Sequence, residues 1–265
     1  MGHEAATPPH VLILGGTTEA VALAHLLTER PWRVTTSLAG RTVPRRLPPG
    51  NVRSGGFGGA DGLAAFLTQQ NVAAVVDATH PFAARISANA RLACDSLNLP
   101  RLRLERPQWT AQPGDRWITA DSPAAAAALL PGLARHVFLT LGTTDLSPFA
   151  ALSNLRFTLR LIEPPPTPPF PGCAVVAGRG PFDVETETAL FRAHGFEALV
   201  GKASGGTATV AKLTAARRLG LPVVMIRRPP AEPGPNVAAA EPAREWLDRR
   251  LRRPDNPSSV FFPDA

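Results

Sequence analysis

The stretch Val11–Leu27 reads VLILGGTTEAVALAHLL: an apolar run, a Gly-Gly turn with two threonines, and an apolar pattern of helical period. This order is typical of a buried parallel strand that feeds a helix through a tight turn. Such a turn presents backbone N–H groups and the positive end of a helix, which together bind phosphate. The spacing GGTTEA differs from the dinucleotide fingerprint G-x-G-x-x-G, so the alternative that Gly15 and Gly16 only turn the chain stays open.

Composition limits the class of protein. The chain has 265 residues, 44% of them hydrophobic, which is enough for one large or two modest domains. It contains no apolar stretch long enough for a bilayer and no signal region at its start, so we expect a cytoplasmic protein without membrane contact. No cysteine or histidine cluster has metal-ligand spacing, so we expect no metal site.

Charge and rare residues narrow the partner. The net charge is +7, but the arginines are scattered and not interleaved with aromatic residues, so a polyanionic small molecule is a better partner than nucleic acid. The chain has no tyrosine, which excludes the Tyr-x-x-x-Lys pair of short-chain dehydrogenases. Lysine occurs only at Lys202 and Lys212, within a chain that otherwise uses arginine for its cations.

Short apolar runs alternate with amphipathic helices in the first half of the chain. This alternation predicts a parallel sheet with helices on both faces, whose ligands bind at the carboxyl ends of the strands. Three conspicuous loops fall at that edge, and a fourth precedes a helix at Asp61. They are Gly15–Glu19, Ser37–Arg41 (SLAGR), Thr79–Phe82 (THPF) and, as the fourth, Gly55–Gly59 (GGFGG).

The second half has a similar design. Residues 137–150, VFLTLGTTDLSPFA, echo VLILGGTTEAVALA at 11–24, and later strands and helices resume the alternation, including a helix over Thr207–Leu219. Residues 229–236 are predicted as a Pro-Gly loop before a terminal helix. We therefore predict a disordered tail over 1–10, a nucleotide-binding domain over 11–112 and a second Rossmann-like domain over 113–265.

The loop SLAGR follows the second predicted strand, where Rossmann-type folds bind the adenosine ribose. NAD-specific versions place an acidic residue there, whereas this chain has Thr35, Thr36 and Ser37, with Arg41 just beyond. Hydroxyls and a guanidinium suit a 2′-phosphate, so the sequence favours NADP over NAD. An exposed turn arginine without a ligand is the alternative.

The segment Asp77–Ala83 reads DATHPFA. His80 is a candidate proton donor, ligand-binding donor or structural hydrogen bonder at the end of a strand, and these alternatives stay open. Pro81 is expected at the first position of the following helix.

The segment 199–212, LVGKASGGTATVAK, predicts a strand, a cation, a glycine turn with hydroxyls, and a helix. Backbone amides over 204–207 would bind a carboxylate or phosphate, with Lys202 adding a point charge. The alternative is that Ser204 or Thr207 only caps the helix. A further glycine turn, GRGPF at 178–182, is expected at the same edge.

Taken together, these motifs resemble the precorrin-6A reductase family of corrin-ring (cobalamin) biosynthesis. The resemblance runs in family order over nearly the whole chain after about His10. It rests on GGTTEA (15–20), SLAGR (37–41), GGFGG (55–59), DATHPFA (77–83), RLERP (103–107), LTLG (139–142), GPF (180–182), KASGG (202–206) and the segment 212–229. The family commonly has K-N-S-G-G, so Ala203 leaves any contact of that asparagine unmade.

The resemblance implies a cytoplasmic oxidoreductase that uses NADPH to reduce one ring double bond of precorrin-6A, an anionic tetrapyrrole, to give precorrin-6B. It also implies two Rossmann-like domains with the active site in the cleft between them, and transient contact with neighbouring pathway enzymes is a further expectation. His80 is the candidate catalytic residue. The implied cofactor-binding residues are Gly15, Gly16, Thr17, Thr18, Glu19, Ser37, Ala39, Gly40, Arg41, Thr79, His80 and Pro81. The implied substrate-binding residues are Gly55, Gly56, Phe57, Gly58, Lys202, Ser204, Gly205, Gly206 and Thr207.

Three other interpretations compete with this one. The first is a cobalt-precorrin-6A reductase that uses NADH or NADPH. The second is a regulatory protein that binds NADP without catalysis, and the third is a nucleotide-sugar transferase. The order of the motifs favours the reductase over both proteins of another class.

Overall fold

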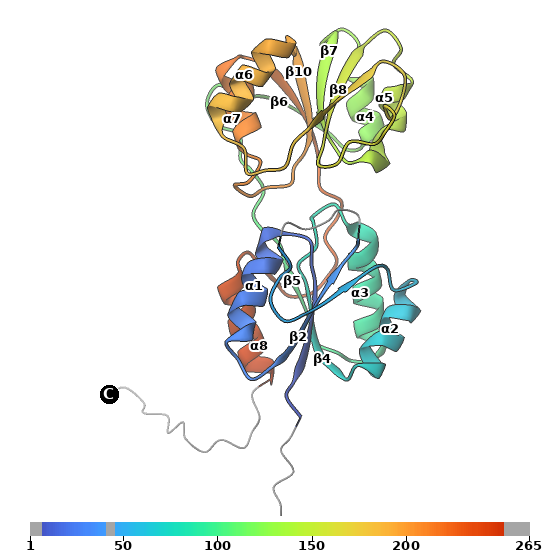
Figure 1. The fold of residues 1–265 in the computed structure, drawn as a ribbon, viewed down its shortest axis with the longest axis vertical. Helices are drawn as coiled ribbons and strands as arrows, with labels where there is room; N and C mark the ends of the chain where they lie inside the picture. Colours follow the sequence, from blue (N-terminus) through green and yellow to red (C-terminus); the bar gives the residue numbers. More distant parts are fainter. Residues whose placement is uncertain (1–6, 41–45, 252–265) are drawn as a thin grey trace, which may run out of the picture. The chain divides into compact units, whose positions relative to one another are not determined.

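The structure, a computed structural model, describes residues 7–40 and 46–251 and divides into two compact units. The N-terminal unit runs to Glu105 and resumes at Glu232, and the C-terminal unit is Arg106–Ala231. Each unit is a six-stranded parallel sheet with helices on both faces (Figure 1). This confirms the predicted α/β fold with two Rossmann-like sheets.

In the N-terminal unit the strand order is β12-β5-β4-β1-β2-β3. Helices α1 and α8 cover one face of this sheet, and α2 and α3 cover the other (Figure 1). The strands are β1 (His10–Leu14), β2 (Arg33–Leu38), β3 (Asn51–Ser54), β4 (Val72–Asp77), β5 (Arg101–Leu104) and β12 (Asn236–Val237). The helices are α1 (Thr18–Thr28), α2 (Ala60–Gln69), α3 (Ala84–Ser96) and α8 (Ala240–Leu251).

The sequences of β1 and α1 explain why these two elements form the core of the N-terminal unit. All five residues of β1 are buried, as a continuous apolar run requires when helices cover both faces of a parallel sheet. In α1 the buried positions recur at helical spacing, so the helix packs one apolar face on the sheet. These positions are Ala20, Leu23, Ala24 and Leu27.

The C-terminal unit has the order β6-β11-β10-β7-β8-β9, with α4 and α5 on one face and α6 and α7 on the other (Figure 1). Its strands are β6 (Arg116–Ala120), β7 (His136–Thr140), β8 (Arg156–Leu161), β9 (Cys173–Ala177), β10 (Ala198–Lys202) and β11 (Pro222–Ile226). Its helices are α4 (Pro123–Ala128), a 3-10 turn η1 (Thr143–Asp145), α5 (Ser147–Ala150), α6 (Val184–His194) and α7 (Ala211–Arg218).

The two sheets have equivalent strand orders. They differ in the position along the sequence of one edge strand, which is β12 in the N-terminal unit and β6 in the C-terminal unit. In the C-terminal unit β6 comes first and lies beside β11, whereas in the N-terminal unit β12 comes last and lies beside β5. Each of these strands leads into a helix, α4 or α8, that packs beside the helix following the central strand. The weak internal echo between residues 11–24 and 137–150 therefore marks equivalent places in two similar folds.

The predicted domain boundaries are wrong at the C-terminal end. The prediction assigned residues 113–265 to the second domain, but the chain returns to the N-terminal unit at Glu232. There Arg103 N–H donates to Pro235 O at 3.0 Å and Glu105 N–H donates to Val237 O at 2.9 Å, while α8 buries Ala243 in the core beside α1. A two-residue strand inside a Pro-Gly loop carries no periodicity, so the sequence pattern concealed it. Of the predicted tail, residues 1–6 lie outside the described residues and His10 belongs to β1.

Candidate active site

The turn between β1 and α1 is built from two glycines and a capping threonine. A Cβ on Gly15 would lie 2.8 Å from Cγ2 of Thr36, and Gly16 has a φ of +109°, a region that favours glycine. Thr17 Oγ1 accepts the N–H of Ala20 at 3.1 Å and so begins α1. The turn therefore places the N-terminus of α1, with its positive end, at the carboxyl end of β1.

Hydrogen bonds join this turn to the ends of the neighbouring strands. Gly15 N–H donates to the carbonyl of Ser37 at 2.9 Å, and the Thr17 hydroxyl donates to the carbonyl of Ala78 at 2.7 Å. Gly55 N–H donates at 2.9 Å to the carbonyl of the residue that ends β2. Because β1 lies between β4 and β2, where the order of the sheet reverses, this edge is the switch point at which open α/β sheets bind ligands.

Arg53, near the end of β3, links the end of β2 to the glycine loop at residues 55–59. Its guanidinium donates to Ser37 Oγ at 2.7 Å and to the carbonyls of Gly55 and Gly56 at 3.1 and 3.0 Å. It also lies 3.9 Å from the centre of the Phe57 ring. Sequence reasoning missed Arg53, although parallel pairing of β2 with β3 sets it beside Ser37 in register. A half-buried cation thus stands at the place where the ribose was predicted.

At the end of β4, Asp77 is fully buried and holds the THPF loop. Its Oδ1 accepts the N–H and the hydroxyl of Thr79 at 3.1 and 2.7 Å. Arg103 of β5 pairs with the same oxygen at 2.7 Å and with Glu105 at 2.7 Å. The carboxylate therefore fixes the backbone just before His80.

His80 takes part in the turn that follows. Its Nδ1 accepts the N–H of Phe82 at 3.2 Å, so the neutral ring carries its proton on Nε2. The prediction that Pro81 begins the next helix is wrong, because α3 begins at Ala84. Ala83 N–H donates to the carbonyl of His80 at 2.8 Å, and this separate turn occupies the residues around Pro81.

The described cofactor-binding candidates all lie at this one edge. They are Gly15, Gly16, Thr17, Thr18, Glu19, Ser37, Ala39, Gly40, Thr79, His80 and Pro81. The substrate candidates Gly55, Gly56, Phe57 and Gly58 follow β3 in the same unit. Arg41 lies outside the described residues.

The other substrate candidates belong to the C-terminal unit, after β10. The carbonyls of this loop are held by side chains: Arg228 Nε donates to Ala203 at 2.8 Å, Arg106 Nε donates to Ser204 at 2.8 Å, and Trp109 Nε1 donates to Gly206 at 2.7 Å. A Cβ on Gly205 would lie 2.0 Å from a backbone oxygen of the neighbouring segment, so only glycine fits there. The loop that contains Lys202, Ser204, Gly205, Gly206 and Thr207 is therefore tightly built.

Two details of this loop differ from the sequence predictions. Helix α7 begins at Ala211 and not at Thr207, and its N-cap Val210 makes no side-chain cap, so neither Ser204 nor Thr207 is a helix cap. Lys202 forms an ion pair with Asp145 of η1. A carboxylate of this chain therefore already holds the lysine that was expected to bind a substrate carboxylate.

Within residues 7–40 and 46–251, no group of three His, Cys, Asp or Glu side chains is placed to hold a metal ion. No helix in the same ranges is long and apolar enough to cross a membrane.

Comparison with known proteins identifies relatives over almost the whole chain. The family model described as precorrin-6x reductase CbiJ/CobK matches residues 10–248. A precorrin-6A reductase of Rhodococcus erythropolis is 49% identical over 92% of this chain and 99% of its own. A precorrin-6A reductase of Rhodobacter capsulatus is 44% identical over 89% and 95%, and a cobalt-precorrin-6A reductase of Priestia megaterium is 31% identical over 84% and 92%.

The fold has a counterpart among solved structures. The structure described as CobK precorrin-6A reductase matches with a TM-score of 0.87 and 43% identity, over 93% of this chain and 99% of that one. Sequence and structure agree on one family, whose members are oxidoreductases. The chain therefore belongs to the precorrin-6x reductase family.

Proposed function

We propose that this chain reduces one ring double bond of precorrin-6A with NADPH, giving precorrin-6B in cobalamin biosynthesis. Membership of the family supports a reductase with a nicotinamide cofactor. The observation that carries the cofactor assignment is the glycine turn at the start of α1, hydrogen-bonded to the ends of β2 and β4 at the switch point. The relatives named for the metal-free substrate are also more similar than the one named for the cobalt form.

The glycine turn would hold the pyrophosphate. Gly15 and Gly16 keep side chains away from the phosphates, and Thr17 and Thr18 begin the helix whose positive end faces them. Glu19 follows in the first turn of α1.

The end of β2 would hold the adenosine ribose and its 2′-phosphate. Residues 37–40 read Ser-Leu-Ala-Gly and carry no acidic side chain to bind a free 2′-hydroxyl. Arg53 already donates to Ser37 Oγ, and a guanidinium suits a phosphate. We therefore assign the preference for NADPH to Arg53 together with Ser37, Ala39, Gly40 and Arg41.

Thr79, His80 and Pro81 would border the nicotinamide, which when bound supplies the hydride. Asp77 and Arg103 hold Thr79 in place, so the loop is positioned before any ligand arrives. His80 presents Nε2–H as a hydrogen-bond donor, and the proton that completes the reduction comes from His80 or from water. Correct placement of the reacting carbons supplies most of the rate in this account.

The candidates for substrate binding lie in two loops, one in each unit. Gly55, Gly56, Phe57 and Gly58 leave room for a flat ring, because three of them have no side chain. Lys202, Ser204, Gly205, Gly206 and Thr207 would bind its carboxylates, and a net charge of +7 attracts a polyanion. We place the reaction in the cytoplasm.

The test is NADPH oxidation with enzymatically prepared precorrin-6A, followed by mass analysis of the macrocycle. We expect NADPH to be oxidised faster than NADH and the ring to gain two hydrogens. NADPH binding without oxidation would point to the cobalt-containing substrate, which the same assay tests next. Absence of NADPH binding would contradict the role of the glycine turn.

A further inference from the structure

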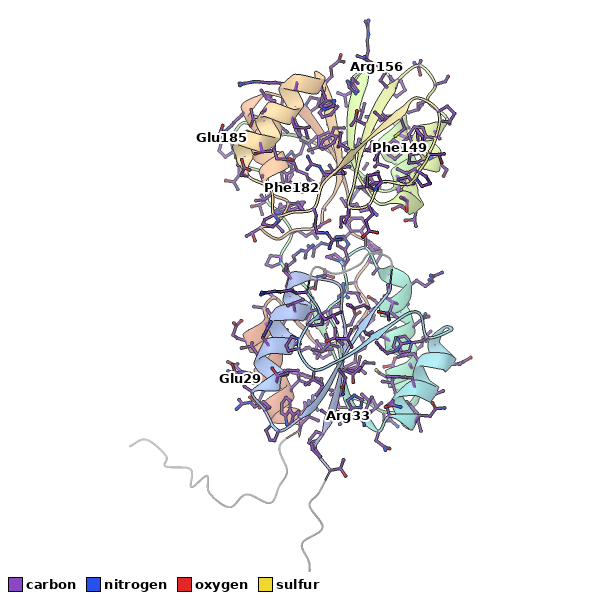
Figure 2. All side chains as sticks on the ribbon, in the orientation of Figure 1. Glu29, Arg33, Phe149, Arg156, Phe182 and Glu185 are labelled. Atoms are coloured by element: carbon purple, nitrogen blue, oxygen red, sulfur yellow. The ribbon has the colours of Figure 1, made fainter. Side chains whose placement is uncertain are left out.

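The C-terminal unit contains a small cavity beside the segment that follows β10, with the buried side chain of Lys212 in its wall. Its volume is about 200 Å³, and it lies at the carboxyl edge of β7, β8 and β9. Figure 2 shows Phe182 at the opposite end of this unit from Arg156, the first residue of β8. Its lining includes Thr140, Arg160, Gly178, Gly180, Phe182 and Lys212.

Lys212 is the buried cation of this cavity. It lies in the first turn of α7 with only 7% of its surface exposed, and its Nζ donates to Thr140 Oγ1 at 2.9 Å. The Thr140 hydroxyl donates its own hydrogen to the carbonyl of Val200 at 3.1 Å, so its oxygen faces the ammonium as an acceptor. Within the described residues this hydroxyl is the one hydrogen-bond partner of Nζ, so further ammonium hydrogens remain for a ligand.

Arg160 adds a second positive charge near Lys212, and it binds the carboxylate of Glu187, which is therefore not paired with the lysine. Arg160 makes a two-point ion pair with Glu187 at 2.9 and 2.7 Å, and the side chain of Glu187 is 1% exposed. Both oxygens of Glu187 are therefore engaged, and the three groups sum to one buried positive charge. The pKa of Lys212 is lowered to about 8, chiefly by burial and in addition by the charge of Arg160, while Glu187 opposes the shift.

Glycines keep the cavity wall thin on two sides. A Cβ on Gly201 would lie 3.2 Å from Thr140 Oγ1 and 3.8 Å from Lys212 Nζ, so this glycine leaves room beside the ammonium. On the other side, a Cβ on Gly178 would lie 3.2 Å from the Phe182 ring, which stacks 4.1 Å from the Arg160 guanidinium. The GRGPF turn predicted from the sequence is thus one wall of the cavity.

We propose that this cavity is a carboxylate subsite, in which Lys212 binds one carboxylate arm of the polycarboxylate substrate. The inference rests on the proposed function for the identity of the substrate, but not for the chemistry of the subsite. A cavity of about 200 Å³ is smaller than the roughly 300–1,000 Å³ that encloses a whole drug-sized ligand, so it fits an arm and not the ring.

The presence of only two lysines allows a direct test with lysine labelled with ¹³C at Cε. Each lysine gives one signal, assigned with Lys202→Arg, and the pH titration of each is followed with and without propionate at constant ionic strength. We expect propionate to raise the pKa of Lys212 by about one unit or more, because a bound carboxylate favours the ammonium form. An unchanged Lys212 titration, or equal shifts at both lysines, would overturn the proposal.

Kinetics give the second arm of the test. Lys212→Met keeps most of the length of the side chain but removes the ammonium, and we expect it to raise KM for precorrin-6A by roughly tenfold to a hundredfold. Its kcat and the KM for NADPH should stay near wild type, and Lys212→Arg should restore part of the loss. An unchanged KM for precorrin-6A would contradict the subsite. The propionate titration needs no turnover, so it decides the proposal even if the proposed reduction fails.

Discussion

The two units follow the same strand order but continue differently after their central strands. In the N-terminal unit Gly16 has a φ of +109°, and the chain enters the 11-residue helix α1. At the equivalent position of the C-terminal unit Gly142 has a φ of −83°, and the chain makes η1 and the four-residue α5. Pro148 stands where α1 has Ala22, and proline in a helix interior removes a hydrogen bond, so a long helix cannot form there.

The difference separates two ways of binding anions. The N-terminal unit offers backbone N–H groups at a helix end, which suit a pyrophosphate. The C-terminal unit places side-chain cations at the same edge of its sheet, with Lys202 paired to Asp145 and Lys212 buried in the cavity. We therefore propose that one fold, used twice, offers a nucleotide site in the first copy and carboxylate sites in the second.

The largest effect we expect comes from the buried ion pair of the N-terminal unit. Arg103→Leu leaves Asp77 buried without its cation and should lower the free energy of unfolding by about 3–5 kcal/mol. Hydrogen exchange followed by mass spectrometry should show faster exchange in the N-terminal unit alone. Arg101→Leu is the control on the same strand, because Arg101 bonds only a carbonyl among the described residues and should cost about 1 kcal/mol. Equal losses would contradict the assignment.

The next prediction concerns the C-terminal unit, where a substitution should raise the free energy of unfolding. Because burial lowers the pKa of Lys212 to about 8, the unfolded chain binds more protons than the folded one between that pH and its ordinary pKa. Burial of the charged ammonium therefore lowers the free energy of unfolding by its full amount below pH 8, and this loss disappears as the pH rises from about 8 to 10.5. Lys212→Met should therefore raise the free energy of unfolding by about 3 kcal/mol at pH 7, and by little near pH 10.5. Denaturant unfolding at both pH values measures this, and a gain that did not depend on pH would contradict it.

The third prediction compares the loop after β4, which contains His80, with the loop after β10, which contains Ser204. His80→Ala should lower kcat by less than about a hundredfold, because positioning and not proton transfer supplies most of the rate. Ser204→Ala, at the end of β10, should instead raise KM for precorrin-6A. Steady-state kinetics and NADPH titration separate the two, and complete loss of turnover in His80→Ala with NADPH binding intact would make His80 essential.

The smallest effect compares the two glycines directly. Gly16→Ala forces an alanine into a φ of +109° and should weaken NADPH binding by about tenfold. A Cβ at either glycine meets nothing within 4 Å, so crowding does not complicate the result. Gly142→Ala is the matched control, since its φ is ordinary, and it should leave the Kd for NADPH within about twofold. Similar losses in both variants would remove the distinction between the units.

Local patterns in the sequence predicted the fold well. The buried run of β1, the capping Thr17 and the spacing of apolar residues in α1 are local signals, and the structure confirms the elements they predict. The family resemblance, carried by ordered motifs, is confirmed by the family model and the relatives. The assignment of individual site residues stays a prediction.

The features that sequence analysis missed depend on contacts between distant segments. β12 is strand only because it pairs with β5, more than a hundred residues earlier. Arg53 is a candidate site residue through its place beside Ser37, and Lys212 through a cavity formed with β7, β8 and the GRGPF turn. No spacing along the chain encodes these neighbours.

The most direct test of the division between the units is hydrogen exchange with and without NADPH. We predict that NADPH slows exchange in peptides that cover residues 15–20, 37–40 and 78–83, and leaves peptides over 141–147 unchanged. Protection of residues 141–147 without protection of residues 15–20 would contradict the account, because the nucleotide would then bind the unit in which no long helix follows the central strand.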